Sequence, residues 1–80
     1  MGTITVELNV NPVVLRMMES APAGRLTLGA GSTIHDLLTS IGLGPRGSRL
    51  LLSVNGRVVS QLTPLAEGDR VTIMPVLGGG

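Results

Sequence analysis

The 80-residue sequence contains no cysteine, lysine, phenylalanine, tyrosine or tryptophan, and it has a single histidine. Without cysteine, the chain can form neither a disulfide framework nor a thiolate metal site, and one histidine cannot supply a zinc ligand set. The absence of aromatic side chains removes the stacking platforms on which proteins bind single-stranded nucleic acid. These absences argue against thiol redox chemistry, histidine–cysteine zinc sites and most forms of RNA binding.

Charge of either sign is also scarce. Six arginines and five acidic residues leave a formal net charge of +1, which is too small to attract nucleic acid or an anionic membrane. No apolar run approaches the roughly 20 residues that a membrane span needs, and the first residues lack the pattern of a secretory signal. We therefore expect a cytoplasmic protein that binds neither nucleic acid nor membranes.

Apolar residues are nevertheless frequent enough for a folded domain. They make up 42% of the sequence, and glycine contributes a further 12 residues. A chain of this length allows a single small core, so the glycines are expected at turns and at the C-terminal end. The sequence therefore predicts one domain over residues 1–75, followed by a tail at residues 76–80.

Two-residue alternation of apolar and polar side chains is typical of half-buried strands, and it predicts a strand at residues 3–10. Four further strands are predicted at residues 25–28, 50–54, 57–60 and 70–74. Asn55-Gly56 is the dipeptide most typical of a two-residue hairpin turn. Residues 44–47 are expected to form a loop. Residues 13–24 are interpreted as a loop packed on the core, with a short helical turn as the alternative.

One amphipathic helix is predicted after Thr33. Thr33 and Asp36 have the spacing of a capping box, and Gly42 suits the left-handed position that ends a helix. Apolar residues occur at i, i+3, i+4 and i+7, namely Ile34, Leu37, Leu38 and Ile41. The expected order is strand, strand, helix and three strands, which indicates an α+β domain with one small sheet packed on one helix.

Candidate catalytic residues are few. Residues 29–33 run from a strand to a helix as a phosphate-binding loop would, but they lack the P-loop lysine and the third glycine of a dinucleotide-binding motif. His35 has no partner in sequence that would make it a general base. Glu67 and Asp69 flank a turn glycine and are interpreted as solvated acids. We therefore predict no catalytic residue and no metal site.

The glycines at the C-terminal end are the one segment for which the sequence indicates a function. Glycine is entropically costly in any ordered element, so Gly78, Gly79 and Gly80 are poorly explained as structural filler. A segment without Cβ atoms is thin enough to enter a narrow channel and place an α-carboxylate inside a partner. We therefore predict that Leu77, Gly78 and Gly79 lead into the active site of another protein and that Gly80 carries the reactive group.

The order of these segments resembles the MoaD/ThiS family of ubiquitin-like sulfur carriers. The matching segments are Val54–Val59, Thr63–Leu65, Glu67–Val71, Pro75–Val76 and the terminal glycines, and Gly31–Leu38 is similar to the family's helix entry. The resemblance implies a β-grasp fold, in which a small mixed sheet of four or five strands packs on one main helix. It also implies a flexible C-terminal glycine tail.

The resemblance further implies a function without catalysis by the chain itself. An adenylating enzyme of the ubiquitin-activating type would use ATP to activate the Gly80 carboxylate, and a sulfur donor would convert it to a thiocarboxylate. The sulfur would pass to a second enzyme, such as the large subunit of molybdopterin synthase or thiazole synthase. The chain would then be a carrier, or the small non-catalytic subunit of a sulfurtransferase, with no bound cofactor.

Two questions of function stay open at the level of sequence. Pro75-Val76 and the long first loop are similar to the molybdopterin branch, which is slightly favoured, whereas a triple glycine is more typical of the thiamine branch. The alternative functions are a ubiquitin-like protein modifier and a non-reacting β-grasp interaction domain.

The partner surface is expected on the exposed face of the sheet beside the tail. The residues predicted to contribute to it are Arg57, Val58, Arg70, Met74 and Val76. The missing lysines suggest a further hypothesis, because a chain without side-chain amines offers little that could attack its own activated end.

Overall fold

The computed structural model describes residues 2–76, apart from the side chains of residues 46–48. Its centre is a five-stranded mixed sheet, formed by β1 (Thr3–Val10), β2 (Arg25–Gly29), β3 (Leu50–Val54), β4 (Arg57–Val58) and β5 (Arg70–Pro75). The strand order is β2-β1-β5-β3-β4. The predicted α+β class and sheet are therefore confirmed.

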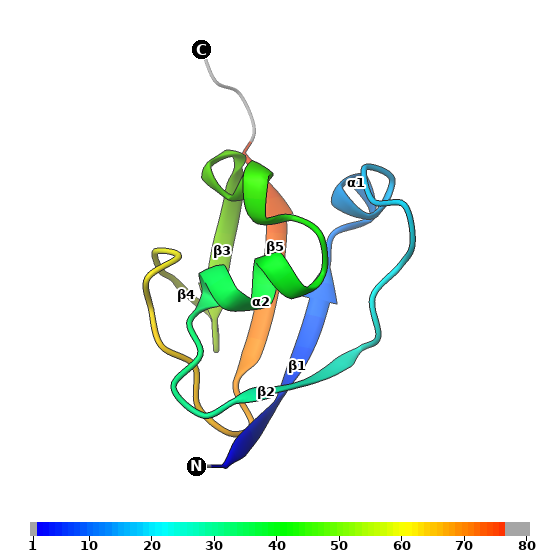
Figure 1. The fold of residues 1–80 in the computed structure, drawn as a ribbon. Coiled ribbons are helices and arrows are strands. Elements are labelled where there is room, and N and C mark those ends of the chain that lie inside the picture. The colour runs from blue at the N-terminus through cyan, green and yellow to red at the C-terminus, as the bar shows by residue number, and fades with distance from the viewer. Residues whose placement is uncertain (1, 77–80) are drawn as a thin grey trace.

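The two central strands run parallel to one another. Residues Glu7 to Val10 of β1 pair with Arg70 to Ile73 of β5, while the other strand pairs are antiparallel. Parallel strands need a crossover connection, and here the intervening chain contains the helix that covers one face of the sheet (Figure 1). As a consequence, the chain enters at one end of the sheet and leaves from its middle at the other end.

Helix α2 (Ile34–Ser40) forms as its sequence predicts. The Thr33 hydroxyl accepts a hydrogen bond from the Asp36 amide, and the Asp36 carboxylate accepts one from the Thr33 amide, so the capping box is complete. Gly42 follows the helix at φ +86°, which L-residues rarely adopt. The core consists of buried aliphatic side chains from α2, the inner sheet face and the connections, namely Ile4, Val6, Leu8, Val14, Ile34, Leu37, Leu38, Leu43, Leu50, Leu52, Val54, Leu65, Val71 and Ile73.

Two short helical segments lie at the end of the sheet from which the chain leaves (Figure 1). In α1 (Pro12–Leu15), the Asn11 side chain caps the Val13 amide and Val14 is fully buried. The second segment, η1 (Gly44–Arg49), is a 3-10 helix where a loop was predicted. A Cβ atom at Gly44 would lie 3.1 Å from the Thr39 hydroxyl, so glycine permits this close approach.

Strand β4 is shorter than predicted, because it ends at Val58 and not at residue 60. After Val59, the chain turns toward the start of α2, where the carbonyls of Gln61 and Thr63 accept hydrogen bonds from the His35 and Ile34 amides. This backbone is therefore used to cap the helix instead of extending the hairpin. No helix in the described part of the chain is long and apolar enough to cross a membrane.

Candidate functional site

The C-terminal strand leaves the domain from the centre of the sheet. β5 is flanked by β1 and β3, Pro75 pairs with Leu50, and the Val76 amide donates to the Arg49 carbonyl at 3.3 Å. The chain is thus held by backbone hydrogen bonds up to Val76. The predicted tail residues Leu77, Gly78, Gly79 and Gly80 lie outside the described residues.

An apolar groove borders the point where the chain leaves. It has a volume of about 470 Å³ and is lined by Asn11, Val13, Leu51, Met74, Pro75 and Val76. Leu51 and Met74 are register partners on β3 and β5, on the sheet face opposite the core. Val13 and Val76 are 52% and 54% exposed. Exposed apolar side chains gathered at the start of a tail indicate a binding surface.

The structure brings together only some of the predicted surface residues. Met74 and Val76 line the groove. Val58 pairs with Ser53 on the same sheet face, but it lies outside the groove on the edge strand. Arg57 pairs with the core residue Val54 and therefore belongs to the opposite face.

Of the groove residues that were not predicted from the sequence, the two exposed apolar ones are Leu51 and Val13. Leu51 stands in the apolar run of residues 50–54, and such a run does not show which side chains face outward. The signal that identifies Leu51 is its register opposite Met74, which depends on strands far apart in the sequence. Val13 is identified by the packing of α1 beside β5.

Arg70, also predicted at the partner surface, belongs to a polar network at the far end of the sheet. Its backbone amide donates to the Asn55 side chain at 3.0 Å, and the Asn55 amide group donates to Asp69 at 2.9 Å. Asp69 also accepts from the Ala66 amide at 2.8 Å. These hydrogen bonds connect the Asn55-Gly56 turn to the Glu67-Gly68-Asp69 turn, two segments that carry the family resemblance. Their role in the structure is therefore to hold the two turns together.

The other candidates for chemistry are likewise occupied by structural contacts. His35 is exposed, with its Nδ1 atom 3.2 Å from the Gln61 side-chain oxygen. Glu67 accepts a hydrogen bond from the Thr5 amide at 3.0 Å. The amides of residues 33–36 at the start of α2 all donate to acceptors within the protein, so this turn offers no free cluster of donors for a phosphate. Among the described residues, no group of three acidic or histidine side chains could hold a metal ion.

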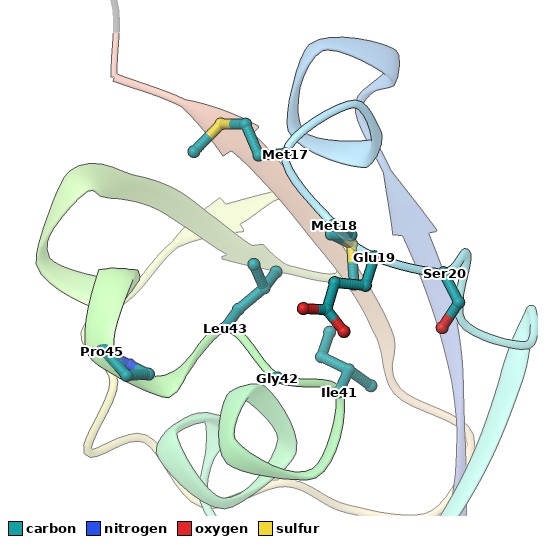
Figure 2. A pocket seen from close by; sticks show the side chains of 8 residues that line it. All are labelled: Met17, Met18, Glu19, Ser20, Ile41, Gly42, Leu43 and Pro45. Atoms are coloured by element: carbon teal, nitrogen blue, oxygen red, sulfur yellow. The ribbon is translucent and has the colours of Figure 1, made fainter.

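A second hollow lies between the chain after α1 and the segment joining α2 to η1. Its volume is about 540 Å³ and it is lined by Met17, Met18, Glu19, Ser20, Ile41, Gly42, Leu43 and Pro45. Figure 2 shows the Glu19 carboxylate directed toward the space between Leu43 and Ile41. Glu19 is the charged residue among those that line this hollow, whereas the groove beside Val76 is lined by apolar side chains and Asn11.

Comparison with known proteins gives a family match over most of the chain. The model of the ThiS family matches residues 17–80, a range that includes the terminal glycines. No curated protein sequence matches the chain.

Several solved structures are similar to this fold at low sequence identity. The putative molybdopterin converting factor subunit 1 from Pyrococcus furiosus has a TM-score of 0.68 at 19% identity, with 92% of this chain and 99% of that chain covered. Small archaeal modifier protein 1 of H. volcanii has the same TM-score at 16% identity and the same coverage. A Caldiarchaeum subterraneum ubiquitin has a TM-score of 0.57 at 14% identity, with 99% and 100% covered. These likenesses confirm the predicted β-grasp fold.

Proposed function

This chain belongs to the ThiS family of ubiquitin-like sulfur carriers, and from that membership we propose that it carries sulfur on the C-terminal carbon of Gly80. The observation that carries the proposal is the extent of the family match, which continues through Gly78, Gly79 and Gly80. The fold adds support, because β5 directs the chain out of the domain beside an exposed apolar groove.

The proposed chemistry resides in the main chain and needs no side chain of this protein. The Gly80 carboxylate attacks the α-phosphorus of ATP in the adenylating enzyme, which releases pyrophosphate and leaves an acyl-adenylate. Hydrosulfide, as the sulfur donor, then attacks the acyl carbon and AMP departs with the bonding electron pair, so that the end of the chain becomes a thiocarboxylate after loss of the sulfur-bound proton. Adenylation is needed because a carboxylate is a poor electrophile and lacks a good leaving group.

The proposal accounts for the glycines in the tail. Residues 77–80 can extend at most about 14 Å beyond Val76, and the three glycines among them carry no side chain that a narrow channel would have to accommodate. In this proposal the groove lined by Leu51, Met74 and Val76 binds the partner's surface, while the tail enters its active site.

The proposed partners are two enzymes that act in turn. The first is an adenylating enzyme of the ubiquitin-activating type, which uses ATP. The second enzyme accepts the sulfur. A molybdopterin-synthase large subunit is favoured over thiazole synthase as this acceptor, because of Pro75-Val76 and the long connection between β1 and β2. The chain receives sulfur after the first enzyme has acted and supplies it to the second, and each enzyme supplies its own catalytic groups.

Adenylation tests the proposal directly. We expect ATP–pyrophosphate exchange by the organism's adenylating enzyme to depend on this protein and to fall to the background rate when Gly80 is deleted. The matched control deletes Gly2, which is exposed at the opposite end of the sheet, and should leave exchange unchanged. Full exchange without Gly80 would contradict the proposal.

A ubiquitin-like modifier is the second candidate, because the fold is shared with a small archaeal modifier and with a ubiquitin. The same activated Gly80 would then be attacked by a lysine amine of a target protein, with release of AMP. Conjugates of higher mass joined through Gly80 would favour this function. A thiocarboxylate as the stable product would favour the sulfur carrier.

A further inference from the structure

Arg16 and Arg49 are neighbours of residues that line the groove beside the chain exit. Arg49 is next to the exit, because its carbonyl accepts the hydrogen bond of the Val76 amide. Arg16 caps the C-terminus of α1, three residues after the groove residue Val13. Residues at that spacing lie on the same side of a helical turn, with Cβ atoms about 5–6 Å apart.

Neither arginine is neutralised within the described part of the protein. Both are exposed, and the one ion pair among the described side chains joins Arg70 Nε to Glu7 Oε2 at 3.1 Å, at the far end of the sheet. Both arginines are therefore exposed and without an ionic partner among the described residues, and both are neighbours of residues that line the apolar groove. Glu19, the acidic residue nearest to Arg16 in sequence, faces the separate hollow described above (Figure 2).

We propose that Arg16 and Arg49 bind carboxylates at the border of the opening through which the partner enzyme receives the tail. This inference rests on the proposed function and specifies the chemistry of the partner's surface. The partner would be apolar where it contacts Leu51 and Met74, and it would carry acidic side chains around that apolar area. An apolar centre with a charged rim is the usual arrangement of a protein interface. Charges at such a rim mainly raise the rate of association and set its dependence on salt.

The test compares two double variants that lose the same charge at opposite ends of the molecule. Arg16→Gln with Arg49→Gln removes the two groups at the exit, and Arg25→Gln with Arg57→Gln removes two exposed arginines far from it. The Arg16 amide donates to the Pro12 carbonyl and the Arg49 carbonyl accepts from the Val76 amide. Because both hydrogen bonds are made by the backbone, we expect unchanged thermal unfolding. The probe is the purified adenylating enzyme, and the association rate constant is measured over a range of salt concentrations.

We expect the exit variant to associate about 10-fold more slowly than the wild type at low salt. That difference should shrink toward zero at about 0.5 M salt, where exposed charges are screened. The far-end variant should associate at nearly the wild-type rate. Equal slowing of both variants, or no slowing of the exit variant, would overturn the inference.

Steady-state kinetics keep this inference separate from the proposed function. The exit variant retains the tail, so we expect a higher KM for the carrier in ATP–pyrophosphate exchange and an unchanged kcat. Deletion of Gly80 should abolish kcat while leaving the association rate near that of the wild type. A loss of kcat in the exit variant would contradict a docking role for Arg16 and Arg49.

Discussion

At the scale of single residues, the most informative side chain is Asn55. Its backbone adopts φ 53° in the turn between β3 and β4, and Gly56 follows at φ 86°. The sequence predicts this turn, because Asn-Gly tolerates two successive positive φ angles. The sequence does not show the second role of Asn55, whose side chain reaches Asp69 and the Arg70 amide, because that contact joins segments 14 and 15 residues apart.

Replacement of Asn55 separates these two roles. Asn55→Ala removes both side-chain hydrogen bonds, and it also places alanine at a positive φ, which is strained for a residue with a Cβ atom. We therefore expect a loss of about 2–3 kcal/mol in the free energy of unfolding. Asn55→Gly removes the same bonds without the backbone penalty, and we expect a loss of about 1 kcal/mol. Denaturant unfolding measures both values, and equal losses would show that backbone conformation is unimportant here.

At the scale of the elements, local signals define α2 and long-range pairing defines the groove. The capping box of Thr33 and Asp36 and the apolar spacing of the helix are readable from a few neighbouring residues. The groove forms because β3 and β5 pair in a register that puts Leu51 opposite Met74. Since one residue of slip would turn these side chains to the other face, no local pattern could have identified Leu51.

The groove can be tested by comparing two apolar residues on the same sheet face. Leu51→Ala shortens a groove side chain, and we expect binding to the adenylating enzyme to weaken by about 1–2 kcal/mol, roughly 5- to 30-fold. The matched control is Val58→Ala, because Val58 is 66% exposed and lies outside the groove, and its effect should stay below about 0.5 kcal/mol. Equilibrium titration measures both affinities, and a larger effect at Val58 would move the binding surface toward β4.

At the scale of the whole molecule, the fold separates structural residues from binding residues. The polar network of Asn55, Asp69 and Arg70 lies at the end of the sheet where β5 begins, and the groove lies where β5 ends. The element order and the β-grasp fold could be predicted because strand alternation, the capping box and the hairpin turn agree with one another. Of the residues predicted at the partner surface, Met74 and Val76 line the groove, whereas Arg57 and Arg70 lie apart from it. Their positions depend on strand register, which the sequence does not show.

The point where β5 leaves the sheet connects the fold to the proposed function. The proposed function assigns the chemistry to the C-terminal end of a small domain that has an aliphatic core. The parallel pairing of β1 and β5 places the point of departure between two neighbouring strands, where backbone hydrogen bonds fix its direction. In the function proposed above, residues 77–80 would enter a partner from this fixed point of departure.

The most direct test locates the sulfur on the protein. The wild-type chain is incubated with its adenylating enzyme, ATP and a sulfur donor, and its intact mass and fragments are measured. We predict the mass increase of one oxygen replaced by sulfur, confined to the fragment that ends in Gly80. An unchanged mass with an enzyme that demonstrably adenylates the chain, or sulfur located on any other residue, would contradict the assignment of Gly80 as the sulfur-carrying residue.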